Sequence, residues 1–144
     1  MRGLESVNGI GRRRAKIFVP GYNRSTMFGS PPPEIDVNTL AEKLKSDEDF
    51  VLLDVREEDE LLRAKIGDRR MAHLPLSRLA AQGMAALPES AQGQGRSVYI
   101  LCHHGNRSMQ VTRWLVKLGW KNVVNVRGGI DEYARRVDAS VGLY

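Results

Sequence analysis

The sequence predicts an α/β domain in which a central parallel sheet has helices on both faces. Short apolar segments rich in β-branched residues alternate with amphipathic stretches along residues 34–144, and no hairpin turn joins two of the apolar segments. The chain has 144 residues, which is enough for one hydrophobic core but not for a second full domain. Successive strands joined through helices give a parallel sheet that is covered on both sides.

The first elements expected in the domain are a helix, a buried strand and a second helix. Residues 36–46 predict a helix capped by Asp36 or Asn38, because apolar residues recur on one face and lysines stand near its end. Residues 50–55, FVLLDV, are almost continuously apolar, which is typical of a strand buried on both faces. Residues 56–67 place acidic side chains first and basic ones last and end at a glycine, which predicts the second helix.

A weaker strand and a third helix follow. Residues 72–76, AHLPL, predict a short strand that ends near Pro75, since proline cannot donate to a sheet ladder. The next segment predicts a helix that Ser77 caps and that ends near Pro88.

The last part of the chain predicts two more strands, each followed by a helix. Residues 97–102, SVYILC, form the strand with the clearest apolar pattern, and the helix after it begins near Arg107 or Ser108. The buried face of this helix is expected to contain Met109, Trp114, Leu115 and Leu118. Residues 122–126 predict a strand, and a glycine turn joins it to a final helix at residues 130–137.

Residues 1–33 are expected to form a basic, flexible, disordered leader and linker before the domain at residues 34–144. The whole net charge of +5 comes from the first 30 residues, and the domain itself is neutral in sum. The domain has no basic stripe with interleaved aromatic residues and no apolar run of membrane-spanning length, so we expect neither a nucleic-acid nor a membrane partner. A single cysteine fits a reducing compartment, and we expect a cytoplasmic protein, with organelle import as the alternative that the arginine-rich leader leaves open.

The loop CHHGNRS, residues 102–108, follows the most clearly buried strand and precedes a helix. Cys102 is the only cysteine in the chain, so it has no disulfide partner within it. The unpaired amides of the first helical turn and Arg107 favour a thiolate over a thiol, and Gly105 lets successive amides face a common centre. We therefore expect a nucleophile that is open to solvent in an anion-binding loop; the alternative is a small buried hydrophobic side chain.

The length of this loop separates one anion chemistry from another. Four residues lie between Cys102 and Arg107, one fewer than in cysteine phosphatases, whose loop wraps a tetrahedral phosphate. A shorter loop suits a single additional sulfur atom, held on the cysteine as a persulfide whose charge the amides stabilise. An arsenate reductase or a phosphatase is the alternative that the loop length disfavours.

Three segments, in this order, resemble the single-domain rhodaneses, which are sulfurtransferases: VLLDVREEDEL at residues 51–61, the loop CHHGNRS, and GWKNVVNVRGGIDEY at residues 119–133. The resemblance covers roughly residues 34–135 and implies a rhodanese-like three-layer α/β fold with a central parallel sheet. The stretch GDRRMAHLP at residues 67–75 departs from the family's histidine–isoleucine–proline spacing, and IDEY replaces the aromatic residue that often follows the paired glycines.

The resemblance also implies an activity and the residues that perform it. Sulfane sulfur would move from a small donor anion, such as thiosulfate or a persulfide, through Cys102 to a thiol or to cyanide, or to an acceptor protein, without any cofactor. Asp54 and Arg56 match the family's Asp-x-Arg pattern and would support the loop from the neighbouring strand end. The residues expected to bind substrate, chiefly through backbone amides, are His103, His104, Gly105, Asn106, Arg107 and Ser108.

Two other interpretations of these residues stay in view. His103 and His104 do not easily converge on one tetrahedral metal ion, and His73 is the only other histidine, so we expect no metal site. The acidic run at residues 57–60 is expected to be the solvated first turn of a helix. A binding module with this fold but little sulfur transfer is the alternative from a different functional class, although such a module has no need of an intact nucleophilic loop.

Overall fold

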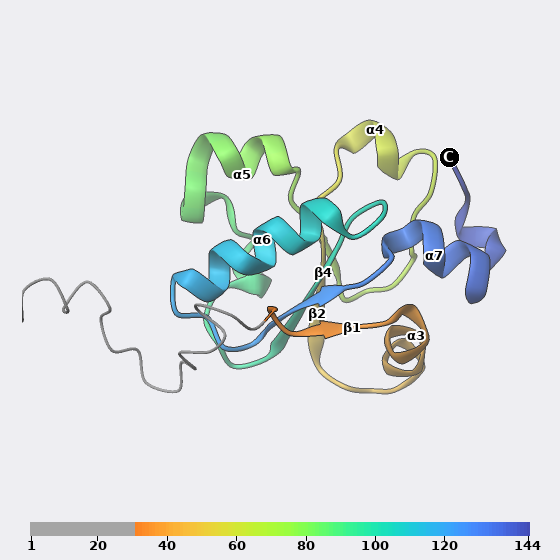
Figure 1. Cartoon of the computed structure of the whole chain (residues 1–144), viewed down its shortest axis with the longest axis horizontal. Coiled ribbons are helices and arrows are strands. Elements are labelled where there is room, and N and C mark those ends of the chain that lie inside the picture. Colours follow the sequence, from red (N-terminus) through yellow and green to blue (C-terminus); the bar gives the residue numbers. More distant parts are fainter. Residues whose placement is uncertain (1–30) are drawn as a thin grey trace, which may run out of the picture.

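The computed structural model describes residues 31–144, which form a five-stranded sheet with helices packed on both faces (Figure 1). Every strand pair is parallel, and the strand order is β1-β5-β4-β2-β3. The strands are β1 (Glu34–Ile35), β2 (Phe50–Asp54), β3 (Met71–His73), β4 (Ser97–Leu101) and β5 (Val123–Val126). The predicted parallel α/β architecture is confirmed, and the two-residue strand β1 is an addition that the sequence pattern did not indicate.

The helices divide between the two faces of the sheet. The longer helices are α3 (Val37–Lys45), α5 (Leu76–Gln82), α6 (Asn106–Lys117) and α7 (Gly129–Arg136), and the short helix α4 is Glu58–Leu61. Residues 31–144 also contain three 3₁₀ turns, at Gly83–Ala86, Glu89–Ala91 and Ala139–Val141. Apolar side chains of α5 and α6 share one buried cluster, and those of α3 and α7 share the other.

Alternation along β2 produces the two clusters. Val51 and Leu53 pack with α5 and α6, whereas Phe50 and Leu52 pack with α3 and α7. Successive side chains of a strand point to opposite faces, so a strand that is apolar throughout must be covered twice. The expected three-layer arrangement is therefore present, with β4 at the centre of the sheet between β5 and β2.

The helix predicted over residues 56–67 is much shorter in the structure. Only Glu58–Leu61 is helical, and the chain then forms turns and irregular structure up to β3. Ala64 and Ile66 are buried in the cluster of α3 and α7, and the amide of Lys65 donates to the carbonyl oxygen of Val141 at 2.9 Å. These tertiary contacts replace the hydrogen bonds that a longer helix would have made, so the charge pattern alone gave the wrong length.

The other helices confirm one prediction and differ from expectation in two details. The predicted cap of α3 is confirmed, because the Asp36 carboxylate accepts from the Thr39 amide at 2.8 Å. The predicted cap of α5 is wrong: Pro75 occupies that position, and Ser77 instead lies in the first turn, where it donates to the Glu57 carboxylate. Leu118 is half-exposed rather than buried, since α6 turns its Val111, Thr112, Leu115 and Val116 side toward the sheet.

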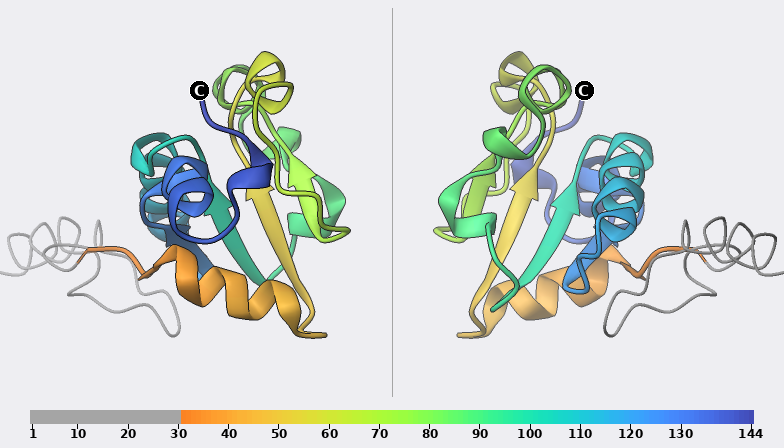
Figure 2. Two further views of the ribbon diagram at one scale, coloured as in Figure 1. Left: turned by 90° about the vertical axis from the view of Figure 1, so that its right-hand side faces the viewer. Right: turned by 90° about the vertical axis from the view of Figure 1, so that its left-hand side faces the viewer.

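The carboxyl ends of the central strands define one end of the domain. Figure 2 shows the arrowheads of β2 and β4 pointing to the end where α4 and the last residues of the chain lie. Residues 1–30 of the expected leader lie outside the described part. The expected flexibility is wrong for the end of the linker, because Pro32 is buried and the Pro33 carbonyl oxygen accepts from the Asn125 amide at 2.9 Å. Among residues 31–144, no helix has the length and apolarity needed to cross a bilayer.

Candidate active site

Cys102 lies directly after β4, at the carboxyl edge of the sheet, and α6 begins four residues later at Asn106. Gly105 is the residue that caps α6, with a φ of +102°, in the left-handed region that favours glycine. A Cβ at this position would stand 3.0 Å from the backbone nitrogen of Gly128, so a side chain has little room there. The loop is therefore closed tightly onto the start of a helix, as the sequence predicts.

The Cys102 sulfur receives hydrogen bonds from the loop and from the first turn of α6. The amide of Gly105 is 3.1 Å from Sγ, and the amide of Ser108 is 3.3 Å from it. The Ser108 hydroxyl also lies 3.3 Å from Sγ, where either group can donate. Of the residues expected to donate backbone amides, Gly105 and Ser108 contact Sγ, and they supply donors for a negative sulfur at a helix N-terminus.

The expectation that this thiol is open to solvent is wrong. Cys102 is only 1% exposed and shares the buried cluster of α5 and α6. An ion at such a depth is costly unless it is hydrogen-bonded, and the donors from Gly105 and Ser108 meet that requirement. In this conformation almost no part of Cys102 is accessible to a donor molecule.

The N-terminus of α7 fixes the backbone of the cysteine loop. The amide of Ile130 donates to the carbonyl oxygen of Cys102 at 2.9 Å, and the amide of Asp131 donates to that of His103 at 3.0 Å. In a trans peptide unit the N–H points away from the C=O, so these bonds turn the amides of His103 and His104 away from α7.

Gly129 permits this close approach of α7 to the loop. Its φ is +63°, and a Cβ there would overlap the carbonyl groups of Cys102 and His103. The paired glycines at the start of α7, Gly128 as its cap and Gly129 as its first residue, are therefore part of the construction of the site.

Arg107 does not point a free charge at the sulfur. Its guanidinium donates twice to the Glu60 carboxylate, at 2.7 and 2.9 Å. This hydrogen-bonded pairing lowers the pKa of Glu60 to about 2 and raises that of Arg107. The prediction that residues 57–60 form a wholly solvated turn is thus wrong for Glu60, whose side chain is 15% exposed.

Asp54 and Arg56 form a buried ion pair at the end of β2. The Arg56 Nη2 lies 2.8 Å from the Asp54 carboxylate, and both side chains are sealed from solvent. Burial is the largest single influence and opposes the charge of Arg56, but the hydrogen bonds and charge of Asp54, together with Tyr144, outweigh it and leave the pKa of Arg56 raised. Arg56 also donates to the carbonyl oxygens of Glu60 and Ala64, at 3.2 and 2.8 Å.

The pair therefore reaches the cysteine loop indirectly. Arg56 holds the backbone of α4, and α4 carries the Glu60 carboxylate that holds Arg107. The Tyr144 hydroxyl joins the same network, because it accepts from Arg56 at 3.0 Å and donates to Glu60 at 2.8 Å. The predicted support from the neighbouring strand end thus has a physical route, through Glu60 rather than by direct contact.

The two loop histidines form an aromatic stack. The His103 ring lies between His104 and Tyr144, with a centroid separation of 3.9 Å on each side. Burial and the nearby His104 lower the pKa of His103, which favours its neutral form. His104 is exposed and faces the Asp131 carboxylate at 3.9 Å.

Ligand atoms of His103, His104 and Asp131 lie within 4.8 Å of one another, so these neighbours converge more closely than the sequence suggested. The lone pair of an imidazole nitrogen lies in the plane of its ring. Two stacked rings that are 28° from parallel cannot both direct such lone pairs at one nearby ion. A metal would therefore require the stack to open.

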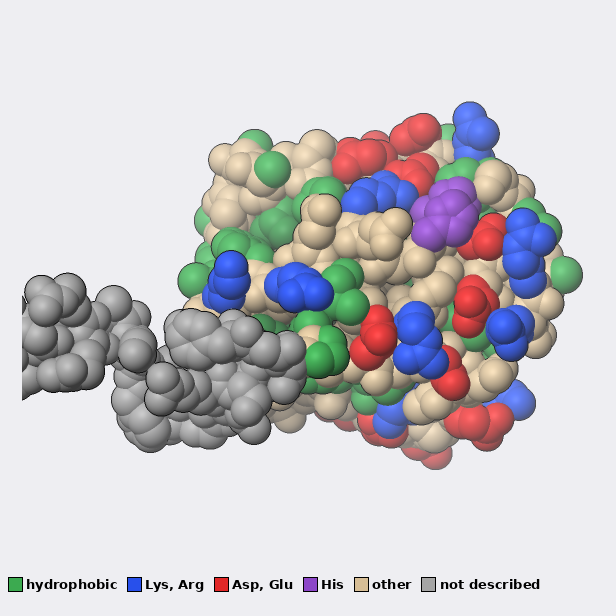
Figure 3. Space-filling model, in the orientation of Figure 1, with side chains coloured by type: hydrophobic (Ala, Val, Ile, Leu, Met, Phe, Trp, Pro, Cys, Tyr) green, Lys and Arg blue, Asp and Glu red, His purple; other side chains and the backbone are tan. Residues whose placement is uncertain are grey.

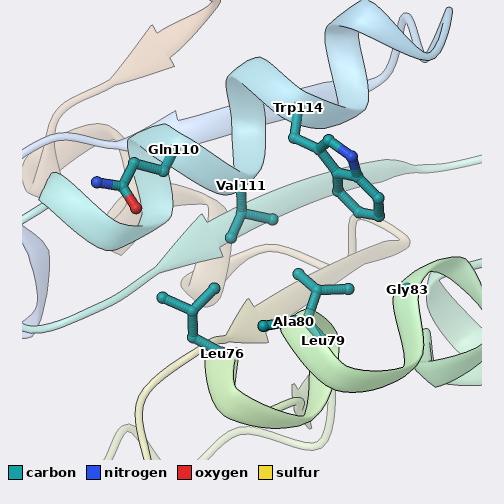
Figure 4. A pocket seen from close by; sticks show the side chains of 7 residues that line it. All are labelled: Leu76, Leu79, Ala80, Gly83, Gln110, Val111 and Trp114. Atoms are coloured by element: carbon teal, nitrogen blue, oxygen red, sulfur yellow. The ribbon is translucent and has the colours of Figure 1, made fainter.

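The remaining loop residue, Asn106, is exposed at the first position of α6. An apolar hollow of about 280 Å³ lies further along this helix, between α5 and α6 (Figure 4). It is lined by Leu76, Leu79, Ala80, Gly83, Gln110, Val111 and Trp114. The loop residues 102–108 do not line this hollow, so it is separate from the cysteine cradle.

Sequence reasoning placed the loop correctly but missed Glu60, Tyr144 and the structural use of Gly129. Glu60 and Arg107 are 47 positions apart, and no local pattern pairs them. The paired glycines before α7 were the one available indication, since consecutive glycines often mark a close backbone approach.

The comparisons with known proteins agree on one family. The sequence model of the Rhodanese-like domain matches residues 36–136. A protein of Allochromatium vinosum named sulfurtransferase is 34% identical over 102 residues, which are 71% of this chain and 88% of that protein. YrkF of Bacillus subtilis, named as a candidate sulfur carrier protein, is 30% identical over 118 residues, which are 82% of this chain; the chain spans only 60% of that relative.

A solved structure shows the same fold. The crystal structure of a rhodanese-related protein from Thermoplasma volcanium aligns with a TM-score of 0.59 and 30% sequence identity, and the alignment covers 73% of this chain and 93% of that one.

Proposed function

This chain belongs to the rhodanese-like domain family, and we propose that it is a sulfurtransferase that carries sulfane sulfur as a persulfide on Cys102. The observation that supports this proposal most strongly is the placement of Sγ under the amides of Gly105 and Ser108. Relatives named as sulfurtransferase and sulfur carrier agree with a role in sulfur transfer.

The proposed reaction has two displacements. In the first, the Cys102 thiolate attacks the outer sulfur of a donor, a bond from Sγ to that sulfur forms, and the donor's own bond to the sulfur breaks. The electron pair leaves with the donor remnant, which is sulfite from thiosulfate or a thiolate from a persulfide. In the second, an acceptor thiolate or cyanide attacks the outer sulfur of the Cys102 persulfide and releases the cysteine thiolate.

The chain would support this cycle with hydrogen bonds that its backbone amides donate to the sulfur atoms. The amides of Gly105 and Ser108 stabilise negative charge on Sγ before attack and after release. In the persulfide, the charge moves to a sulfur about 2 Å further out, where the amides of His103 and His104 become the candidate donors. These amides are oriented by the hydrogen bonds from α7 to the loop carbonyl groups.

The burial of Cys102 favours a second candidate function. A sulfur that is 1% exposed fits a binding module that transfers sulfur slowly or not at all. The two candidates differ in whether a persulfide forms on mixing with a donor.

Mass spectrometry of the intact protein after incubation with thiosulfate or with cysteine persulfide tests the proposal. We expect a gain of one sulfur atom that cyanide removes and that the Cys102→Ser variant does not show. Ser108→Ala serves as the matched control, because it retains the thiol and both amides and should still gain the sulfur. No adduct with either donor would favour the binding module, and hydrolysis of an aryl phosphate that depends on Cys102 would favour a phosphatase.

A further inference from the structure

The charge of the single arginine in the cysteine loop is already neutralised within the protein. Arg107 is bound by Glu60 through two short hydrogen bonds, and the Glu60 side chain is largely buried. A carboxylate held in this way stays ionised throughout the physiological pH range. The charges of Arg107 and Glu60 therefore sum to zero, and an incoming anion meets both groups together.

The histidines of the loop add little positive charge. His103 is stacked between two rings, and its Nε2 is buried without a hydrogen-bond partner in the described part of the chain. A protonated ring would need a partner for that buried N–H, so the surroundings favour the neutral form. His104 faces Asp131, and that carboxylate is in turn bound by Arg135 at 2.9 Å.

The short helix beside the loop contributes further negative charge. α4 and the residue before it carry four carboxylates, namely those of Glu57, Glu58, Asp59 and Glu60. Glu58 and Asp59 are exposed, and the hollow next to them is also lined by Glu57 and by a single basic residue, Arg78, so its lining has a net negative charge. Figure 3 shows acidic side chains gathered over α4, with histidine and some Lys or Arg side chains beside them on the same face. The approach to the cysteine loop from this side is thus acidic.

We propose that the sulfur donor of this site is an organic persulfide, R–S–SH, rather than the thiosulfate dianion, and that Glu60 sets this preference by neutralising Arg107. This inference rests on the proposed function and specifies its substrate class. Thiosulfate carries two negative charges, which the neutralised loop and the acidic helix do not balance. An organic persulfide has at most one charge on its reacting sulfurs, and the amides that face Sγ can stabilise one charge.

The donor reaction balances without an additional reactant. The Cys102 thiolate attacks the outer sulfur of R–S–SH, the Sγ–S bond forms, and the S–S bond of the donor breaks. The electron pair leaves as R–S⁻, the transferred sulfur brings its hydrogen as Sγ–S–H, and loss of this proton to solvent leaves the negative charge on the outer sulfur. No net oxidation occurs, because one persulfide replaces another.

The test compares thiosulfate with cysteine persulfide and with a persulfidated cysteine-containing peptide, each scored by kcat/KM for persulfide formation on Cys102. We expect both persulfides to exceed thiosulfate in the full chain, and the faster of the two identifies whether the donor thiol is a small molecule or part of a polypeptide. In Glu60→Gln, kcat/KM for thiosulfate should rise about tenfold relative to that for cysteine persulfide, which is the effect expected of removing one charge near a dianion in a solvated site.

Glu58→Gln is the matched control, because it removes the same charge from an exposed position of α4 without touching Arg107. Its ratio of the two kcat/KM values should change by less than a third of the Glu60→Gln effect. Equal changes in the two variants would mean that the general field of α4 acts rather than the pair with Arg107. A uniform loss with all donors in Glu60→Gln would mean that Glu60 only maintains the structure. Either result would overturn the proposal.

A measurement on the unaltered protein avoids any folding defect of the variants. Raising KCl from about 0.02 M to about 0.5 M screens charges, so kcat/KM for thiosulfate should rise while that for cysteine persulfide stays nearly constant. A fall with thiosulfate would show an attractive site and contradict the inference. If thiosulfate instead proves the better donor but still loads Cys102, the proposed function stands and only this inference fails.

Discussion

Two Asp-x-Arg pairs in this chain have the same local geometry in different surroundings. In Asp54–Arg56 and in Asp68–Arg70, the arginine donates to the aspartate through its backbone amide, its Nε and its Nη2. The first pair is sealed from water, whereas the side chains of Asp68 and Arg70 are 18% and 7% exposed.

The difference lies in what each guanidinium reaches. Arg56 lies beyond the carboxyl end of β2 and contacts α4, which carries Glu60. Arg70 precedes β3, lies over the Phe50 ring and donates to carbonyl oxygens at the end of α3 and just after it. The same three-residue pattern therefore supports the neighbourhood of the cysteine loop at Asp54–Arg56 and links scaffold elements at Asp68–Arg70. The two roles differ because the first pair follows the carboxyl end of a strand and the second precedes a strand.

Removing the aspartate charge should separate the two pairs most clearly. Asp54→Asn leaves Arg56 buried without its counter-charge, and breaking such a pair typically costs about 3–5 kcal/mol. Asp68→Asn should cost about 1 kcal/mol, because its arginine is partly solvated and keeps its carbonyl partners. Urea unfolding measures both costs, and initial rates of persulfide formation should fall at least several-fold only for Asp54→Asn. Equal losses of rate would break the comparison.

Acid should lower the stability of the folded protein by protonating Glu60, the partner of Arg107. Its pKa is about 2 in the folded protein against an ordinary value of 4.5, so its stabilisation is complete above about pH 4.5 and is lost as pH falls toward 2. The full effect is at most about 3 kcal/mol. The pKa of Asp68 is also lowered, by its hydrogen bond to Arg70, and this pair loses stability in the same direction.

Unfolding free energies measured from pH 5 downward can separate these contributions. Each variant, Glu60→Gln or Asp68→Asn, should remove the contribution of its own carboxylate to the pH dependence of the unfolding free energy and so make that dependence less steep. If Glu60→Gln leaves the profile unchanged, the pairing of Glu60 with Arg107 does not contribute as the structure indicates.

Tyr144→Phe should cause a smaller loss of stability, and this loss should come from the network of the Asp54–Arg56 pair. Its hydroxyl group joins Arg56 to Glu60, and removing one hydrogen-bonding group between charged partners costs about 1–2 kcal/mol. Tyr133→Phe is the matched control, because Tyr133 is buried in the same cluster of α3 and α7, whereas the hydroxyl that bridges Arg56 and Glu60 is that of Tyr144. Thermal unfolding of both variants checks the prediction, and a larger loss for Tyr133→Phe would contradict it.

Much of the fold could be predicted because it depends on local patterns. The continuous apolar run of β2 required cover on both faces, and the Asp36 cap and the strand-to-helix position of Cys102 are properties of short segments. The helix after β2 was overestimated because the burial of Ala64 and Ile66 is decided by distant residues.

The unpredicted part of the site has the same physical origin. Glu60 and Tyr144 are close to the loop only in the folded chain, and an acidic run in a sequence does not show which member finds an arginine. The depth of Cys102 was also missed, because the strand-end position predicts proximity to the sheet edge but not how closely the α6 turn covers the sulfur. The Asp-x-Arg pattern occurs twice, so only its place after a buried strand indicated the site.

The smallest expected effect concerns the donors to sulfur themselves. Ser108→Ala removes a hydroxyl 3.3 Å from Sγ but leaves the amides of Ser108 and Gly105 in place. We expect a rate of persulfide formation lower by less than about tenfold, which corresponds to one modest hydrogen bond. A complete loss would show that the hydroxyl, and not the backbone, provides the stabilisation.

The central claim is that backbone amides of the loop hold the charge of the reacting sulfur, and amide NMR before and after loading of Cys102 tests it directly. Addition of one sulfur moves the charge outward, so the amide proton resonances of Gly105 and Ser108 should shift strongly, together with those of His103 and His104. Resonances at the far end of α6, such as that of Lys117, should stay in place, and cyanide should restore the original spectrum. If Cys102 takes up sulfur while the Gly105 and Ser108 amides remain unshifted, the account is contradicted.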